Sequence, residues 1–304
     1  MKILITGGAG FIGSHLADKL IQKKHKVVVV DNLSSGKKRH INKKAKFYKL
    51  VIQSKKISDI FKKERPDIVY HLAAQMNVRA SIDDPIFDAN TNILGSLNLL
   101  ENSVKSKVKK FVFISTGGAI YGDGVKLPTP ESALEAPISP YGVAKLTIEK
   151  YLHYYNNQYN LPYTVLRLAN IYGPRQDSKG EAGVVAIFSN QLLNNKPLTV
   201  FGGAQTRDFV YVLDVVDAAT KAMSRNIKGI YNIGTSRQTS VDKLAKMMIS
   251  ISESSSKIIH KKYIVGEQLK SCLSASKAKR QLKWSLKYDL NKGLTETINW
   301  FNNN

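Results

Sequence analysis

The first thirteen residues constrain the fold more than any other part of the chain. An apolar run, Ile3-Leu4-Ile5, leads into Thr6-Gly7-Gly8-Ala9-Gly10-Phe11-Ile12-Gly13, and a helical pattern follows over 14–24. This order predicts a buried strand, a glycine turn and a helix that begins near Gly13. Such a turn lets the backbone approach a pyrophosphate, and the N-terminus of the helix faces the phosphates. The pattern therefore indicates a dinucleotide site, although a glycine triplet by itself also fits a tight turn without a ligand.

A second strand ends in the acidic residue that is expected beside such a glycine turn. Val27-Val28-Val29-Val30 ends in Asp31, and an acid at that place can bind the adenosine ribose hydroxyls and repel a 2′-phosphate. Asp31 therefore favours NAD over NADP. The cations Lys37, Lys38 and Arg39 follow closely and keep NADP open as an alternative.

Composition is that of an ordinary globular protein. With 304 residues, of which 43% are hydrophobic, the chain can form one large domain or a large domain with a smaller appendage. The net charge of +23 would suit a nucleic acid or an anionic surface. The lysines are scattered in doublets without a long basic run, so we expect solvated faces and no specific nucleic-acid partner.

Cysteine and histidine usage excludes two further classes. Cys272 is the only cysteine, so no disulfide framework is expected and a reducing cytoplasmic compartment fits. The six histidines show no paired ligand spacing, so no metal site is expected. The start of the chain does not resemble a signal peptide, and no apolar run reaches the length of a membrane span.

Alternating patterns predict an α/β fold with a doubly wound parallel sheet, the Rossmann arrangement. We expect strands over 45–52, 67–71, 110–115 and 163–168, and helices over 57–63, 85–107 and 141–159. After Gly173-Pro174-Arg175 the pattern loosens, with loops at 180–183, 194–197 and 202–205. We therefore predict an NAD-binding domain over 1–174 and a smaller, mainly substrate-binding portion over 175–304. Residues 208–236 could still belong to the first domain, because 231–234 could join its sheet.

A second group of polar residues follows the later strands. Ser115 and Thr116 end one strand, and Tyr141-Gly142-Val143-Ala144-Lys145 comes 25 residues after Thr116. Positions i and i+4 share a helix face, so the Lys145 ammonium can lower the phenol pKa of Tyr141 from about 10 toward the range of a general base. Tyr288 and Lys292 have the same spacing. Only Tyr141 follows a strand that ends in hydroxyls.

In these motifs and their order, the chain resembles the extended short-chain dehydrogenase/reductase family, and within it the nucleotide-sugar epimerases of the UDP-glucose (UDP-galactose) 4-epimerase type. The resemblance runs nearly end to end and continues through His71-Leu72-Ala73-Ala74-Gln75, Asn92-Ile93-Leu94-Gly95-Ser96, 167–175 and 207–214. It implies an NAD-dependent isomerase of carbohydrate metabolism, such as polysaccharide biosynthesis, that inverts C4 of a UDP-hexose through a 4-keto intermediate. The hexose would be glucose/galactose or their N-acetylamino forms.

The resemblance also implies roles for single residues. The cofactor would be held by Tyr141, Lys145 and a set of mainly loop residues: Gly7, Gly10, Phe11, Ile12, Gly13, Asp31, Asn32, Leu33, Ser34, Ser35, Gly36, Leu72, Ala73, Ala74, Gln75, Asn92 and Ala169. Tyr141 and Lys145 would be catalytic together with Thr116, for which Ser115 is the alternative. The substrate would contact Ser115, Thr116, Asn170, Val185, Arg207 and Ser271. Two of these have other interpretations: Arg207 as an ion pair with Asp208, and Asn170 as a turn residue.

Two positions bear on the substrate. Where many relatives carry Arg-x-Gly-Asp, this chain has Ile264-Val265-Gly266-Glu267, so a phosphate-contacting arginine is missing and Lys261 or Lys262 would have to replace it as a point charge. Ser271 falls where relatives use residue size to admit or exclude N-acetylated sugars, and a small serine leaves room for them.

Alternatives remain within and outside this reaction class. A nucleotide-sugar 4,6-dehydratase would need an acidic pair just after Thr116, where Gly117 and Gly118 stand. A uronate epimerase shares every feature seen here. From another class, a non-catalytic nucleotide- or RNA-binding member would keep the fold and use its charge.

The resemblance further suggests a homodimer, formed by helices near 90–104 and 142–158. The second of these has an apolar, aromatic face made of Tyr151, Leu152, Tyr155 and Tyr159. A face of this kind fits either a subunit interface or the core of the domain.

Overall fold

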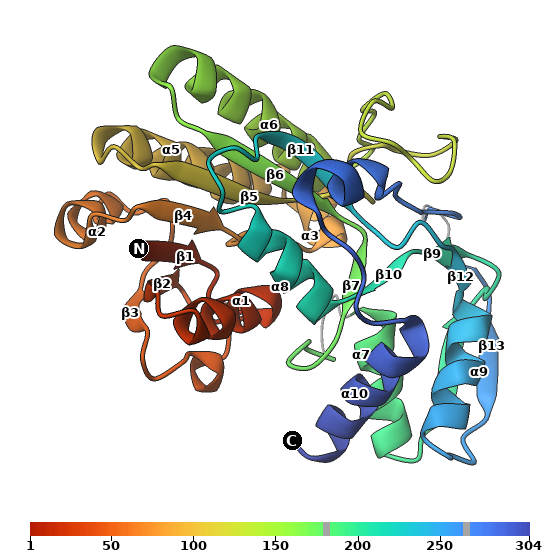
Figure 1. The fold of residues 1–304 in the computed structure, drawn as a ribbon. Helices are drawn as coiled ribbons and strands as arrows, with labels where there is room; N and C mark the ends of the chain where they lie inside the picture. Colours follow the sequence, from red (N-terminus) through yellow and green to blue (C-terminus); the bar gives the residue numbers. More distant parts are fainter. Residues whose placement is uncertain (179–182, 264–267) are drawn as a thin grey trace.

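A seven-stranded parallel sheet forms the centre of the computed structural model, which describes residues 1–178, 183–263 and 268–304 (Figure 1). The strand order is β11-β6-β5-β4-β1-β2-β3. Their bounds are β1 Lys2–Thr6, β2 Lys26–Asp31, β3 Lys46–Lys49, β4 Ile68–His71, β5 Lys110–Thr116, β6 Tyr163–Leu168 and β11 Gly229–Ile233. The predicted doubly wound α/β fold is confirmed.

Helices cover both faces of the sheet, which is why its strands read as nearly continuous apolar runs. One face packs against α1 (Phe11–Gln22) and α8 (Val212–Lys221), and the other against α2 (Ile57–Glu64), α5 (Gly95–Lys105) and α6 (Pro140–Tyr159). Each face of the sheet has its own hydrophobic core, and successive residues of one strand point alternately into the two. Ile3 and Ile5 of β1 face the α1 side, whereas Leu4 faces the α5 side, and all three are fully buried.

Most predicted elements lie where the sequence places them, with three differences. Helix α1 begins at Phe11 and not near Gly13, and β3 covers only four residues of the expected 45–52. The helix expected over 85–107 is three elements: α4 (Pro85–Ala89), a π-helical turn (Asn90–Leu94) and α5. The π turn adds a residue to the helical period and so changes which side chains face the sheet. Such turns occur often at functional sites.

Helix α6 is framed by clear local signals. Ser139 is its N-cap and accepts a hydrogen bond from the Gly142 N–H, Pro140 occupies the first turn, and Asn160 ends the helix in the left-handed conformation. These signals fix the start of the helix one residue before Tyr141. Tyr141 is therefore the second residue of the helix that follows β5.

The C-terminal elements form a third core beside the sheet (Figure 1). It contains α7 (Val184–Leu193), α9 (Val241–Ile251), α10 (Leu290–Asn302) and the strand pair β8 (Leu198–Phe201) and β13 (Ile258–Lys261). Short pairs connect it to the sheet: β7 (Asn170–Tyr172) with β10 (Phe209–Tyr211), and β9 (Thr206–Arg207) with β12 (Thr239–Ser240). Strand β11 pairs with β6 at the edge of the central sheet. The division of the chain at residue 175 stays a prediction.

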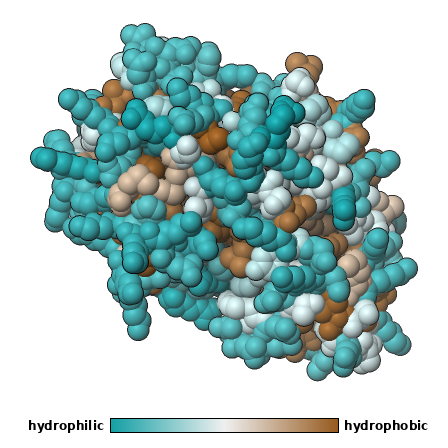
Figure 2. Space-filling view, viewed as in Figure 1, coloured by the Kyte–Doolittle hydropathy of each residue, from teal (hydrophilic) through white to brown (hydrophobic). Residues whose placement is uncertain are grey.

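Hydrophilic side chains spread over most of the face seen in Figure 2, and apolar ones gather in small separate patches. Among the described helices, none is long and apolar enough to cross a membrane.

Candidate active site

The glycine loop between β1 and α1 is built so closely that side chains would not fit. Gly7 has φ +71°, and a Cβ there would lie 2.7 Å from the Ala73 backbone nitrogen. A Cβ on Gly13 would lie 2.1 Å from the Gly7 carbonyl oxygen, so the first turn of α1 rests directly on the loop. Gly10 is the N-cap of α1 and provides no side-chain cap for the first N–H groups. The loop therefore offers the backbone cradle that a pyrophosphate requires.

Asp31 ties this cradle to the loop after β2. Its Oδ2 accepts a hydrogen bond from Ala9 N at 2.9 Å and its Oδ1 accepts one from Leu33 N at 2.8 Å. The Asp31 side chain thus holds the glycine loop and the loop after β2 together at the expected adenosine site, and it also brings a negative charge to that site. Oxygen lone pairs remain for ribose hydroxyls.

Cations also gather beside the cradle, where the Lys37 N–H donates to the Ala9 carbonyl at 3.0 Å. Lys37, Arg39 and Arg175 line a hollow of about 170 Å³ together with His40 and Trp300. Burial, and then the charges of Arg175 and Arg39, lower the pKa of His40 to about 4. Lys37 is 3.6 Å from a carboxylate oxygen of Asp177.

A buried hydrogen-bond chain orders the strand ends beside the cradle. His71 Nδ1 accepts from the Thr6 hydroxyl at 2.8 Å, and the Leu72 N–H donates to that hydroxyl in turn. His71 Nε2 donates to the Ser96 hydroxyl at 2.7 Å, because Ser96 already donates to the Asn92 carbonyl. Burial, followed by the charge of Lys145, holds the pKa of His71 well below its usual value. The imidazole is therefore a neutral structural link.

Asn92, on the π turn, holds the loop after β4. Its Oδ1 accepts from Gln75 N and its Nδ2 donates to Gln75 O, both at 2.9 Å. The Asn92 amide also donates to Asp88, as does the Gln75 side chain. The predicted cofactor residues of this loop are thus fixed by a buried side chain.

Tyr141 and Lys145 come together as their spacing predicts. The Lys145 Nζ lies 5.7 Å from the centre of the Tyr141 ring and donates to the Ile114 carbonyl at 3.1 Å. Burial lowers the pKa of Lys145 to about 8, and the charges of Asp88 and Glu149 oppose that shift. The second Tyr/Lys pair also meets, with Lys292 Nζ 4.6 Å from the Tyr288 ring centre. Spacing alone therefore does not identify the site.

The structure separates the two candidate hydroxyls at the end of β5. Ser115 is buried and donates its proton to Glu149 Oε1 at 2.6 Å. Thr116 is partly exposed, and the one hydrogen bond of its side chain to the described part of the chain is the long one that its Oγ1 accepts from Ala119 N at 3.3 Å. Thr116 is thus the hydroxyl whose proton remains available to a substrate.

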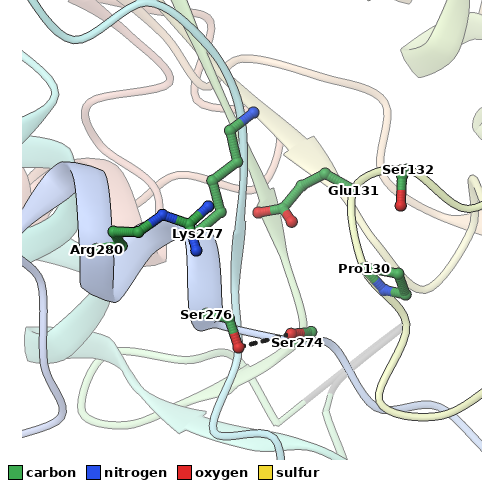
Figure 3. Close-up of a pocket in the computed structure, with 7 residues that line it drawn as sticks. All are labelled: Pro130, Glu131, Ser132, Ser274, Ser276, Lys277 and Arg280. Carbon is green, nitrogen blue, oxygen red and sulfur yellow. Dashed lines mark hydrogen bonds between the residues drawn. The ribbon is translucent and has the colours of Figure 1, made fainter.

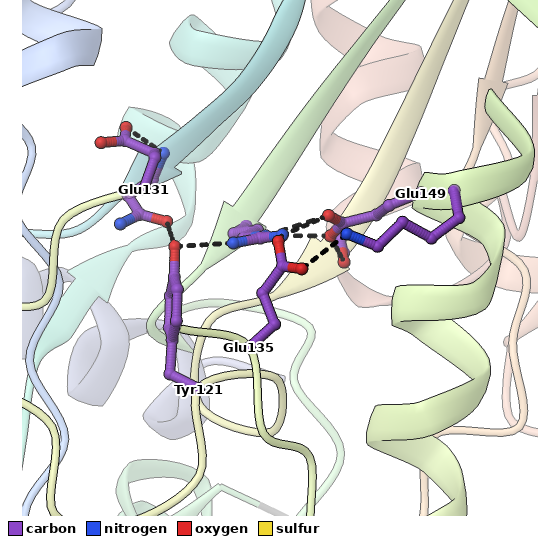
Figure 4. A network of polar contacts seen from close by, with 8 residues as sticks. Tyr121, Glu131, Glu135 and Glu149 are labelled. Atoms are coloured by element: carbon purple, nitrogen blue, oxygen red, sulfur yellow. Dashed lines mark hydrogen bonds and ion pairs between the residues drawn. The ribbon is translucent and has the colours of Figure 1, made fainter. Parts of the chain in front are cut away.

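A polar network anchors α6 to the sheet behind these residues (Figure 4). Arg167, fully buried on β6, donates through Nε and Nη2 to Glu149, through Nη2 to Glu135 and through Nη1 to the Tyr121 hydroxyl. Burial opposes the arginine charge, but Glu149 outweighs it and raises the pKa of Arg167. The loop between β5 and α6 is held through Glu135 and Tyr121.

The predicted substrate residues lie in different settings. Ser271 Oγ and Thr116 Oγ1 are each 3.9 Å from the position of a Cβ on Gly118, so these two hydroxyls share one space. Asn170 belongs to β7 and is exposed, so its interpretation as a turn residue is wrong. Val185 is buried in the C-terminal core, with a side chain that is 1% exposed.

Arg207, on β9, donates to the Thr206 carbonyl at 3.0 Å. Its neighbour Asp208 is fully buried and accepts hydrogen bonds from Thr235 and from the Leu273 N–H. Asp208 therefore holds backbone and side-chain groups, and it does not form the exposed ion pair with Arg207 that the sequence left open. Segment Ile264–Glu267, where the family arginine is missing, lies outside the described residues, as do residues 180–182 of the loop expected at 180–183.

Another open hollow has a volume of about 430 Å³ (Figure 3). Glu131 faces Lys277 and Arg280 across it, with serines below. None of the described residues that line it is a predicted site residue. Within residues 1–178, 183–263 and 268–304, no cluster of three His, Cys, Asp or Glu could hold a metal ion.

Three positions that shape the site are absent from the sequence-based set: Asp88, Glu149 and Arg167. Glu149 continues the i, i+4 series of Tyr141 and Lys145, and that spacing is a signal by which it could have been found. Asp88 has the same i, i+4 relation to Asn92, which donates a hydrogen bond to it, whereas Arg167 gives no such local signal.

Comparison with known proteins shows which family has this sequence and fold. The model of the NAD dependent epimerase/dehydratase family matches residues 3–234. The chain belongs to this family. UDP-glucose 4-epimerase of Mycolicibacterium smegmatis is 38% identical over 310 residues, which cover 100% of this chain and 99% of that relative.

Solved structures agree closely with the fold. UDP-glucose 4-epimerase from Thermotoga maritima, crystallised with UDP-glucose, has a TM-score of 0.96 and 50% identity, covering 99% of this chain and 98% of that one. The Thermus thermophilus UDP-glucose 4-epimerase in complex with NAD has a TM-score of 0.94 and 37% identity, and 99% of each chain is covered.

Proposed function

We propose that this member of the epimerase family is an NAD-dependent UDP-hexose 4-epimerase. The observation that carries the proposal is the contact of the Lys145 ammonium with the Tyr141 ring on α6, together with the Thr116 hydroxyl at the carboxyl end of β5, in the same parallel sheet whose β1 leads into the glycine cradle. Ligands of open α/β sheets bind at that edge. The end-to-end similarity to UDP-glucose 4-epimerases supports the same substrate class.

In this proposal NAD, held at the glycine cradle, supplies a reversible acceptor for the hydride of the sugar C4. The Tyr141 phenolate takes the proton of the C4 hydroxyl, and Thr116 orients that hydroxyl by a hydrogen bond. Lys145 stabilises the phenolate by its charge. The 4-keto sugar would then rotate in the site to present its other face, and Tyr141 would return the proton to the C4 oxygen.

The proposed nucleotide contacts come from the C-terminal portion. Arg207 would bind the diphosphate, for which a guanidinium is suited, and Asn170 would assist from the neighbouring β7. Ser271 shares the space around the Thr116 hydroxyl, and a small side chain there leaves room for an N-acetyl group. We therefore include UDP-N-acetylglucosamine/N-acetylgalactosamine with UDP-glucose/galactose as the substrate pair.

We also propose a homodimer. Apolar side chains are exposed on α4, the π turn and α6: Ile86, Phe87, Leu94, Val143, Tyr151 and Tyr154. On the aromatic face of α6 itself, Leu152 and Tyr155 are buried in the core, whereas Tyr151 and Tyr159 are 37% and 45% exposed. A second copy of the chain would cover this surface. Sedimentation of the purified protein distinguishes the dimer from a monomer.

Proton NMR of the sugar signals tests the reaction. The protein is incubated with NAD and, in separate samples, with UDP-glucose, UDP-N-acetylglucosamine and UDP-glucuronate. The 4-epimer of glucose or of N-acetylglucosamine is the expected product. A product from glucuronate alone would assign a uronate epimerase, and a 6-deoxy-4-keto sugar would assign a dehydratase. Unchanged spectra from protein shown to hold NAD would refute the proposed activity.

A further inference from the structure

Lys145 is a buried cation without a direct ion pair among the described residues. It is 5% exposed, and its hydrogen bond goes to the Ile114 carbonyl, which is neutral. The ammonium otherwise faces the rings of Phe113 and Tyr141. A charge removed from water in this way requires a negative charge nearby. That negative charge must come from an acidic group close to the lysine.

Helix α4 packs directly against α6, the helix of Lys145. Four titratable groups therefore bear on Lys145: Tyr141 and Glu149 on α6, Asp88 on α4, and His71 on β4, whose ring centre is 5.5 Å from that of Phe113. Tyr141 is the group on which the lysine acts. His71 is neutral. Glu149 is already paired, because Arg167 reaches both of its oxygens at 3.0 and 3.1 Å through Nε alone. Asp88 is the remaining acid.

The bonding of Asp88 leaves its charge uncompensated by any direct cation. Its Oδ1 accepts from two neutral amides, Gln75 Nε2 and Asn92 Nδ2, each at 2.9 Å. Its Oδ2 is fully buried and has no hydrogen-bond partner among the described residues. The side chain is 1% exposed. Burial raises the pKa of Asp88, and the two amides and the charge of Lys145 oppose that shift.

We propose that Asp88 is the counter-ion of Lys145, and that it acts through the lysine as a positioning residue that poises Tyr141 for proton exchange. The two amide bonds hold the carboxylate in place. This inference rests on the proposed function, in which Tyr141 exchanges the proton of the C4 hydroxyl. It assigns to α4 a part in the chemistry that the sequence motifs do not mark.

Asp88→Asn tests the charge with little change of shape. The asparagine oxygen can still accept from Gln75 and Asn92, and its amide takes the place of the unpartnered Oδ2. Removing the negative charge of Asp88 lowers the pKa of both Lys145 and Tyr141, because the deprotonated form of each is then favoured. Lys145 then loses its proton at lower pH, and Tyr141 does as well. Both limbs of the pH profile of kcat/KM should therefore move to lower pH, by roughly half to one unit.

The matched control is Asp83→Asn, which removes the same charge from the exposed end of α3 (Val78–Asp83), five positions from Asp88. Its profile should superpose on that of the unchanged protein. A uniform loss of activity at every pH in Asp88→Asn, or an unshifted profile, would overturn the proposal, because a purely structural role lowers the curve without moving its limbs.

A titration without substrate separates this inference from the proposed reaction. The ultraviolet absorbance of tyrosinate is followed against pH, and the curve of Tyr141→Phe is subtracted to isolate Tyr141. Asp88→Asn should move the isolated transition to lower pH, whether or not the sugar is epimerised. An unmoved transition would refute the counter-ion role. Should Asp88→Asn fail to fold by circular dichroism, Asp88→Ser removes the same charge with a smaller side chain and undergoes both measurements.

Discussion

The hydroxyl of Ser115 donates to Oε1 of Glu149 at 2.6 Å, across the junction between β5 and α6. Glu149 lies on the same helix as Tyr141 and Lys145, and Ser115 precedes Thr116. This bond therefore fixes the distance between the strand end that carries one proposed catalytic group and the helix that carries the other two. It divides the two adjacent hydroxyls into a structural one and an available one.

Replacement of these two hydroxyls should have opposite consequences. Thr116→Val keeps the shape of the side chain and removes the hydrogen bond proposed to orient the substrate, so kcat should fall by about a hundredfold, with the free energy of unfolding little changed. Ser115→Ala should cost about 1 kcal/mol of stability and leave turnover within about tenfold. Steady-state kinetics and thermal unfolding of both variants check this. A larger kinetic loss in Ser115→Ala would assign catalysis to the serine.

The pair of Glu149 and Arg167 should respond to substitution much more than the contact of Arg167 with Glu135. Glu149→Gln leaves a fully buried guanidinium without its main partner, which should cost about 3–5 kcal/mol in the free energy of unfolding. The Glu135 side chain is 20% exposed and also pairs with Lys150, so Glu135→Gln should cost far less. Denaturant unfolding at neutral pH measures both. Equal losses would show that Glu149 has no special place in the network.

Graded substitution in the glycine loop should separate cofactor binding from folding. A Cβ at position 13 would lie 2.1 Å from the Gly7 carbonyl, whereas one at position 10 would lie 3.2 Å from the same atom. Gly13→Ala must therefore displace the start of α1, and we expect NAD binding to be lost. Gly10→Ala should keep the fold and bind NAD more weakly. Calorimetric titration measures the affinity for NAD, which should be highest in the wild type, lower in Gly10→Ala and lost in Gly13→Ala.

The sequence predicts the parts of this site that depend on local patterns. The glycine turn, the strand that ends in Asp31 and the meeting of Tyr141 with Lys145 each follow from spacing within one or two elements. The π turn does not, because its register depends on how Asn92 packs against the loop at Gln75.

The parts that join distant elements could not be predicted in the same way. Nothing near Arg167 in the chain marks it as the partner of Glu149, 18 positions earlier on another element. The role of Ser115 depends on that pair. The sequence left Ser115 as an alternative to Thr116, and the hydrogen bond from Ser115 to Glu149 supplies the physical reason for preferring Thr116.

A buried lysine far from the site gives a prediction about stability and pH. Lys110, at the start of β5, is fully buried and donates to the Ile227 carbonyl. Burial, and then the charge of Lys228, lowers its pKa to about 7. Between this value and the unfolded value near 10.5, the unfolded chain holds one more proton than the folded chain. The contribution of Lys110 to stability therefore rises with pH across that window, and its cost is greatest below about pH 7.

Lys110→Met removes this cost while filling a similar volume. The Ile227 carbonyl keeps a donor, because Thr164 Oγ1 donates to it at 2.7 Å. We expect the variant to be more stable by about 1–3 kcal/mol near pH 6, since an unpaired charge is no longer buried, and the gain should shrink toward pH 10. Thermal unfolding of both proteins over this range measures the difference. A gain that stayed constant with pH would show that Lys110 keeps an ordinary pKa in the folded state and that the methionine acts through packing alone.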